Sequence, residues 1–171
     1  MRGEFIESKK LVKGLTFEEF EKLISVIPPK DKLSKTSFLL GYGSGLRISE
    51  VVKLKSENIK ENRIEIWDSK GGKDRIVPKP KGWREYMDKE IPIKKSIRTL
   101  ERNFKKYAKK AKLPENYVFH SLRHGFALLA LERGIPVNDL QLFMGHSSLS
   151  VTNVYTKSRP TGALERWKDL F

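Results

Sequence analysis

The spacing of apolar residues changes once along this chain, and that change constrains the fold more than any other feature. Up to residue 54, and again after residue 96, apolar side chains recur every three or four positions, which predicts amphipathic helices. Between those regions, residues 63–68 and 75–78 alternate in polarity on either side of a glycine-containing turn, which predicts a β-hairpin. The sequence therefore predicts a mostly helical α+β fold with one small antiparallel sheet.

Local capping signals mark the ends of several helices. Thr16 and Glu19 have the spacing of a capping box, and Pro28 and Pro29 end the helix that begins there. Later helices are expected over residues 33–42, directly after Arg47, over 97–112, from about 120 to Gly134, and over 137–144 and 148–157. The apolar run around Leu128 predicts that the helix ending at Gly134 is buried on more than one side.

The length of 171 residues suits one compact domain. We expect this domain over residues 15–171. Residues 1–14 are polar, carry several lysines and show no clear period, so we expect a flexible leader or the stub of a linker there.

Composition narrows the classes of partner and chemistry. Lys and Arg number 35 against 21 Asp and Glu, and the resulting net charge of +14 favours a polyanion, nucleic acid before an anionic membrane. No apolar run approaches the roughly 20 residues that cross a bilayer, and no signal-peptide segment opens the chain, so we expect a cytoplasmic protein. The lack of cysteine excludes disulfides, thiolate catalysis and cysteine-ligated zinc.

The residues that carry phosphate chemistry recur at three places. His120, Arg123 and His124 lie where an apolar run opens into a helix, and a helix N-terminus with cationic side chains favours phosphate. Arg47 lies upstream after a glycine-rich turn. His146 lies downstream, with a tyrosine nine residues after it.

These residue types match the demands of phosphodiester cleavage. Guanidinium groups donate paired hydrogen bonds to phosphate oxygens and stay protonated, and imidazoles move protons near neutral pH. The Tyr155 phenol can serve as nucleophile once adjacent cations favour its deprotonation. The alkoxide leaving group needs a proton, for which Lys70 on the hairpin turn is the candidate and Lys73 its rival.

Four segments in order resemble the signature of the tyrosine recombinases, the phage-integrase and Xer-like family. They are residues 45–50, 70–78, 120–124 and 142–155. The resemblance implies a mixed, mostly helical catalytic domain with a small three-stranded sheet. It also implies strand exchange on double-stranded DNA without metal, ATP or another cofactor, through a 3′-phosphotyrosyl bond at Tyr155 and a free 5′-hydroxyl.

The resemblance also assigns roles to single residues. Arg47 and Arg123 would clamp the phosphate, Lys70 would be the general acid, His120 an acid or base and His146 a hydrogen-bond donor. The supporting residues are Glu50, a structural acid and ion-pair partner, and His124, which we expect to be structural. Two further cations of the hairpin are expected near DNA: Lys73, and Arg75, which we expect to meet a phosphate or solvent.

One departure from the family pattern concerns domain content. Members ordinarily carry an N-terminal helical domain that closes on the far face of DNA, and only about 14 residues precede the first expected helix here. We therefore expect an isolated catalytic domain, either cut from a longer protein or naturally minimal. The family implies self-association on DNA as a tetrameric synapse, and the apolar spacing of residues 161–171 makes that expected terminal helix a candidate contact.

Other functions fit parts of the sequence. Residues 137–157 also suit a helix-turn-helix of a DNA-binding module without chemistry, but that function gives Arg47, His120 and Tyr155 no joint role. A type IB topoisomerase-like relaxase would use the same site residues. A metal-dependent nuclease is disfavoured because no carboxylate cluster accompanies the histidines.

Overall fold

A computed structural model describes residues 14–67 and 74–145. The elements are α1 (Phe17–Ser25), α2 (Lys32–Gly43), α3 (Ile48–Lys53), a 3-10 turn η1 (Ser56–Asn58), β1 (Arg63–Ile66), β2 (Arg75–Pro78), α4 (Glu85–Asp88), α5 (Ile97–Lys110), α6 (His120–Glu132) and α7 (Val137–Met144). The leader expected over residues 1–14 lies outside the described residues except for Gly14, and so do the hairpin turn at 68–73 and the helices expected at 148–157 and 161–171.

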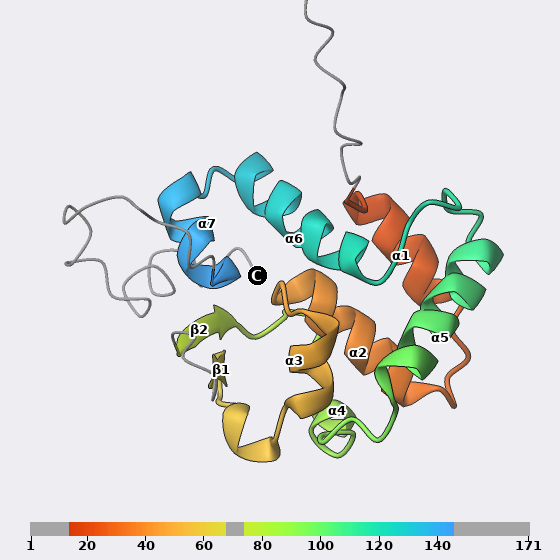
Figure 1. The fold of residues 1–171 in the computed structure, drawn as a ribbon, viewed down its shortest axis with the longest axis horizontal. Helices are drawn as coiled ribbons and strands as arrows, with labels where there is room; N and C mark the ends of the chain where they lie inside the picture. Colours follow the sequence, from red (N-terminus) through yellow and green to blue (C-terminus); the bar gives the residue numbers. More distant parts are fainter. Residues whose placement is uncertain (1–13, 68–73, 146–171) are drawn as a thin grey trace, which may run out of the picture.

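Helix α2 lies at the centre of the fold and packs against α1, α3, α5 and α6 (Figure 1). Its Phe38 is fully buried and meets Phe104 and Phe119 edge-to-face, with ring centroids 5.6 and 5.8 Å apart. This is the preferred geometry of aromatic pairs, so the contact fixes α5 and the start of α6 on α2. Helix α3 also packs against α2, so the two site-bearing helices, α3 and α6, are held on one scaffold.

The predicted hairpin is present as an antiparallel pair of strands. Ile64 pairs with Val77, and both side chains are fully buried. Among the described residues the sheet has two strands, which differs from the three-stranded sheet implied by the family resemblance. Where a third strand would lie, β1 has a single antiparallel bridge between Ile59 and Ile64. The 3-10 turn η1 (Ser56–Asn58) directly precedes Ile59, so no run of extended residues is left there for a third strand.

The helix ends follow their local chemistry. The capping box of α1 is confirmed, because Glu19 N–H donates to Thr16 Oγ1 at 3.2 Å and Thr16 N–H to Glu19 Oε2 at 2.9 Å. Helix α5 ends at Lys110 rather than at the expected residue 112. Lys112 has a φ of 56°, a left-handed conformation that cannot continue a right-handed helix.

The expectation that α6 is buried on more than one side holds for its first half, where Ser121, Leu122, Arg123 and Gly125 are all buried, and is wrong for its second half. Leu122, Phe126 and Ala130 recur at four-residue intervals and are fully buried, whereas Leu128 is 47% exposed and Leu131 43%. After Phe126, helix α6 therefore packs through one stripe. Gly134 follows the helix with a φ of 82°, which confirms the predicted end.

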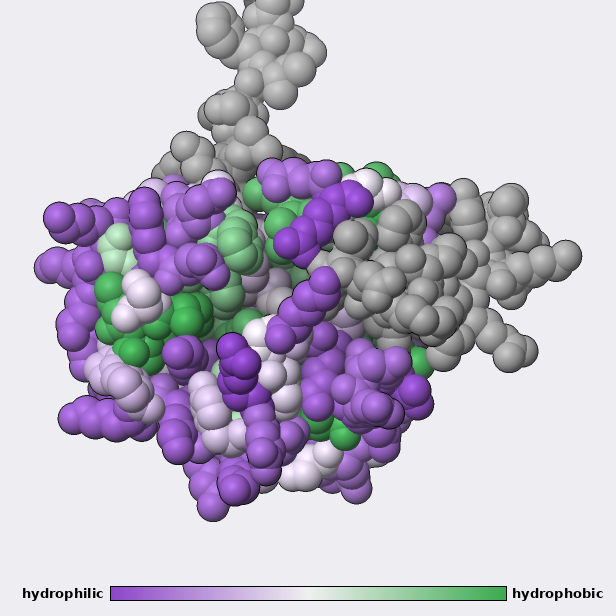
Figure 2. Space-filling model, turned by 180° about the vertical axis from the view of Figure 1, so that it is seen from behind, coloured by the Kyte–Doolittle hydropathy of each residue, from purple (hydrophilic) through white to green (hydrophobic). Residues whose placement is uncertain are grey.

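The face of the molecule opposite the view of Figure 1 is mostly polar. Seen from behind, hydrophilic residues dominate the molecule and apolar residues gather in a few areas (Figure 2). Within the described ranges, no helix combines the length and apolar character needed to cross a membrane.

Candidate active site

The turn before α3 places Arg47 and Glu50. Gly45 has a φ of 67°, and a Cβ there would lie 2.6 Å from the Phe126 ring, so only glycine fits between the turn and α6. Arg47 then caps α3, and Glu50 accepts a hydrogen bond from Arg47 N–H at 2.7 Å and one from Arg47 Nη1 at 3.3 Å. The start of α3 therefore places the Glu50 carboxylate beside Arg47.

Arg75 holds the same carboxylate from the hairpin. Its Nη1 donates to Glu50 Oε1 at 2.7 Å and its Nη2 to Oε2 at 2.8 Å, a two-pronged ion pair. Its Nε donates to the Phe143 carbonyl at 2.8 Å. Only 7% of Arg75 is exposed. The expectation that Arg75 faces a phosphate or solvent is therefore corrected, because all three of its nitrogens donate to groups inside the protein.

Arg123 reaches the cluster from the first turn of α6. It is 2% exposed, and its Nη1 donates to the Gly45 carbonyl at 2.5 Å and lies 4.0 Å from Glu50 Oε2. Its Nη2 donates to the Met144 carbonyl at the end of α7. The arginine therefore joins the turn before α3 to the last turn of α7.

The electrostatics of the cluster are dominated by positive charge. Three guanidinium groups, those of Arg47, Arg75 and Arg123, surround the one carboxylate of Glu50 within 4.0 Å. Burial alone raises the pKa of Glu50, but the hydrogen bonds and charges of Arg75 and Arg47 outweigh it and leave the pKa lowered. Burial, with repulsion from Arg47 and Arg75, lowers the pKa of Arg123 to about 10. Glu50 and Arg123 are therefore both charged at neutral pH.

The two histidines of the motif lie together at the start of α6. Their rings meet edge-to-face with centroids 4.7 Å apart, His120 exposed and His124 half-buried. Burial, and then the charge of Arg123, lowers the pKa of His124, so its imidazole is neutral at pH 7. The helix N-terminus is partly occupied, because the amides of Ser121 and Leu122 donate to the carbonyls of Val118 and Phe119. A phosphate there would rely on side chains more than on these amides.

Four predicted site residues, Lys70, Lys73, His146 and Tyr155, lie outside the described residues. The described chain ends next to them nevertheless meet. Arg75 follows the segment that carries Lys70, and Gly145 directly precedes His146. A Cβ on Gly145 would lie 2.8 Å from Arg75 Cδ, so the two chain ends are in close contact. The structure thus brings together Arg47, Glu50, Arg75 and Arg123, and Gly145 lies against the Arg75 side chain.

Sequence reasoning missed the internal partners of the arginines. These are the backbone carbonyls of Gly45, Phe143 and Met144, which no side-chain pattern marks. The buried position of Arg75 did have a signal. Arg75 and Val77 lie two residues apart in a strand and therefore share a face, and Val77 is a buried residue of the hairpin.

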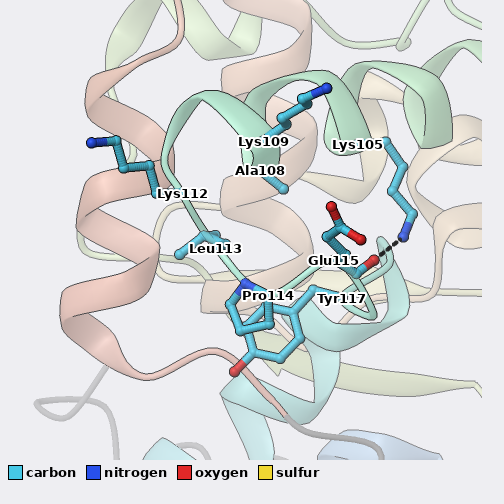
Figure 3. A pocket seen from close by; sticks show the side chains of 8 residues that line it. All are labelled: Lys105, Ala108, Lys109, Lys112, Leu113, Pro114, Glu115 and Tyr117. Carbon is cyan, nitrogen blue, oxygen red and sulfur yellow. Dashed lines mark hydrogen bonds between the residues drawn. The ribbon is translucent and has the colours of Figure 1, made fainter.

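A pocket of about 410 Å³ opens between the end of α5 and the loop that follows it (Figure 3). Its lining residues are Lys105, Ala108, Lys109, Lys112, Leu113, Pro114, Glu115 and Tyr117. Lys105 Nζ donates to the Glu115 carbonyl at 2.7 Å, and none of the site residues above lines the pocket. Among the described residues no group of histidines and carboxylates suits a metal ion.

Relatives of known identity resemble most of the chain. Tyrosine recombinase XerA of Thermococcus onnurineus is 38% identical over 169 residues, which cover 87% of this chain and 59% of the relative. The chain thus spans about three-fifths of the length of that relative.

Solved structures share the fold. The crystal structure of XerA recombinase matches with a TM-score of 0.66 at 24% identity, covering 91% of this chain and 64% of the other. A lambda integrase tetramer bound to a Holliday junction matches with a TM-score of 0.63 at 21% identity, covering 83% and 49%. The mostly helical fold with a small antiparallel sheet is therefore that of tyrosine recombinase catalytic domains. The model of the phage integrase family matches residues 13–161, and the chain belongs to that family.

Proposed function

We propose that this chain is the catalytic part of a site-specific DNA recombinase that cleaves and rejoins DNA through a 3′-phosphotyrosyl intermediate at Tyr155. The observation that carries the proposal is the excess of positive charge at Glu50, where three guanidinium groups face one carboxylate. A bound phosphodiester would supply the missing negative charge. Family membership adds the substrate class, because the relatives are named tyrosine recombinases.

The proposed cleavage step uses residues inside and outside the described ranges. Arg47 and Arg123 bind the non-bridging oxygens and stabilise the charge of the pentavalent transition state. The Tyr155 hydroxyl gives its proton to His120 as its oxygen attacks phosphorus, the bond to the 5′ oxygen breaks, and Lys70 gives that oxygen a proton. His120 and His146 assist by hydrogen bonding and proton transfer, and His124 supports Arg123. Rejoining reverses these steps with a 5′-hydroxyl as nucleophile.

The charge state of the described groups supports this division. Arg123, with a pKa of about 10, carries its charge throughout the neutral range, and its Nη1 and Nη2 are held by the carbonyls of Gly45 and Met144. Arg47 is 41% exposed, so it can meet a ligand from solvent without opening the core. Glu50 holds Arg47 and Arg75 and takes no proton, in keeping with its lowered pKa.

Assembly on DNA is part of the proposal. One structural relative is a tetramer bound to a Holliday junction, and a synapse of four active sites is what strand exchange between two duplexes requires. We infer that this chain self-associates on double-stranded DNA and that residues 161–171 supply one of the contacts, because their apolar spacing needs a complementary surface.

The test uses a library of duplexes with randomised sequence and a nick placed just 3′ of the position to be cleaved, so that the short 5′-hydroxyl fragment diffuses away. Covalent adducts are separated on a denaturing gel, and the DNA-linked peptide is identified by mass spectrometry. We expect an adduct at Tyr155 that forms in EDTA and disappears in Tyr155→Phe. The matched control, Tyr86→Phe on α4, keeps the wild-type yield.

Two results would replace the proposal. DNA binding without any adduct would favour the DNA-binding module. Relaxation of supercoiled DNA without sequence preference or strand exchange would favour the type IB topoisomerase-like relaxase.

A further inference from the structure

Arg75 connects three chain segments that lie far apart in sequence. It begins β2, directly after the segment that carries Lys70, and its guanidinium binds Glu50 at the start of α3 and the Phe143 carbonyl at the end of α7. Figure 1 shows the C-terminal end of α7 lying toward β2, in agreement with the contacts between these elements. Few side chains can make such a junction, because it needs three donors in fixed directions.

The end of α7 is shaped around this side chain. Gly145 has a φ of 61°, and an added Cβ would lie 2.8 Å from Arg75 Cδ and 3.1 Å from Nε. Since hydrogen bonds to Glu50 and Phe143 hold the guanidinium, the arginine has little freedom to give way. Gly145, the last described residue, therefore lies directly against Arg75.

We propose that Arg75 is a positioning residue for the cleavage step, a proposal that rests on the function proposed above. Its Nη1 and Nη2 orient the Glu50 carboxylate, which in turn holds Arg47. Its Nε binds the Phe143 carbonyl and so fixes the end of α7, the helix that precedes His146 and Tyr155 in the sequence. Arg75 contacts no phosphate in this role. It sets the relation between the phosphate-binding arginines and the nucleophile-bearing part of the chain.

The first test compares Arg75→Lys with Arg63→Lys. Arg63 lies on the same hairpin, but it is 40% exposed and pairs with Glu65 through Nε at 3.1 Å and Nη2 at 2.9 Å. Lysine keeps the charge and loses the fork at both positions. Adduct formation is followed under single-turnover conditions at saturating concentrations of a nicked duplex selected from the library above.

We expect Arg75→Lys to lower the rate constant about 100-fold, as a misplacement of about 1 Å does, with full final amplitude and unchanged DNA affinity. Arg63→Lys should stay within about threefold of wild type, because exposed ion pairs contribute little. A purely structural role would reduce the amplitude, as the folded fraction falls, and leave the rate constant alone. That pattern, or equal rate constants in the two variants, overturns the proposal.

A glycine pair gives an independent test. Gly145→Ala and Gly134→Ala both force alanine into a left-handed conformation, with φ values of 61° and 82°. Only at Gly145 does the new Cβ meet Arg75, since nothing lies within 4 Å at Gly134. We expect a slower rate constant in Gly145→Ala alone. Equal rate constants in the two variants would contradict a role for the contact.

Hydrogen exchange separates this proposal from the function on which it rests. Failure of the wild-type chain to form any adduct would refute the proposed function. Deuterium uptake by residues 137–145 would still report on Arg75, because its bond to Phe143 holds the end of α7. We expect faster uptake there in Arg75→Lys than in Arg63→Lys. Equal uptake would refute the positioning role.

Discussion

Two hydrogen-bond networks in this domain are each centred on a carboxylate, but they differ in charge balance. Asp31, which caps α2, accepts hydrogen bonds from Lys95 Nζ at 2.6 Å, Tyr107 Oη at 2.7 Å and Ser34 N–H at 3.2 Å. One cation thus meets one anion, and both are mostly buried. Glu50 instead meets three guanidinium groups, one of which, on Arg47, is 41% exposed.

The difference in charge balance distinguishes a network that only stabilises the fold from one that can also bind an anion. At Asp31 the charges cancel and neutral donors complete the carboxylate, so the network ties α2 to α5 and attracts no further ion. At Glu50 the uncancelled positive charge remains beside an accessible arginine, which favours a bound anion. Four substitutions or conditions test this contrast, in order of decreasing expected effect.

Removing the charge of Glu50 should be the most costly change. Glu50→Gln leaves the buried guanidinium groups of Arg75 and Arg123 without a counter-charge, and we expect the free energy of unfolding to fall by about 3–5 kcal/mol. Urea denaturation at neutral pH measures it. Glu65→Gln, which breaks the exposed pair with Arg63, serves as control and should cost no more than about 1 kcal/mol. Similar losses in both variants would show that the three guanidinium groups can lie together without the negative charge of Glu50.

Removing the charge of Asp31 should affect stability without affecting function. Asp31→Asn weakens the bonds to Lys95 and Tyr107, and we expect a loss of about 2 kcal/mol in the free energy of unfolding. Because that network lies away from the arginine cluster, the rate constant of adduct formation should equal that of wild type. A slower rate constant in this variant, at full amplitude, would mean that the two networks are coupled.

Acid should reveal the contribution of Asp31. Burial raises the pKa of Asp31, but the hydrogen bonds from Lys95, Tyr107 and Ser34 outweigh it and lower the pKa from 3.8 to about 2. A lowered folded-state pKa gives stability that is present above pH 3.8 and is lost as the pH falls toward 2. Denaturation across this interval should show a smaller slope in Asp31→Asn than in wild type. Parallel slopes would assign the acid sensitivity to other carboxylates, including Glu50.

Removing Arg47 should leave stability almost unchanged. Its pair with Glu50 is partly exposed, so Arg47→Ala should change the free energy of unfolding by no more than about 1 kcal/mol. DNA binding should weaken, and the slope of the logarithm of the binding constant against the logarithm of salt concentration should fall by about 1, as expected for one lost phosphate contact. An unchanged salt slope would exclude Arg47 from phosphate binding.

Local signals were sufficient for much of the secondary structure. The capping box of α1 depends on residues three positions apart, and the alternation in the hairpin depends on neighbouring residues, so both could be predicted. The burial of α6 could not be predicted in full. Leu128 and Leu131 are as apolar as the residues that pack, and only the position of α2 and α7 determines which stripe is covered.

The sequence by itself determined the fold class, the hairpin and the candidate site residues, because these follow from short-range spacing and from motifs. It also placed Glu50 as an ion-pair partner, which the structure confirms. Only the tertiary structure decided that Arg75 points inward to Glu50 and Phe143 and that Arg123 bonds Gly45 and Met144. Those bonds join segments separated by 21 to 78 residues, and the partners are mostly backbone carbonyls, which every residue possesses and no sequence pattern distinguishes.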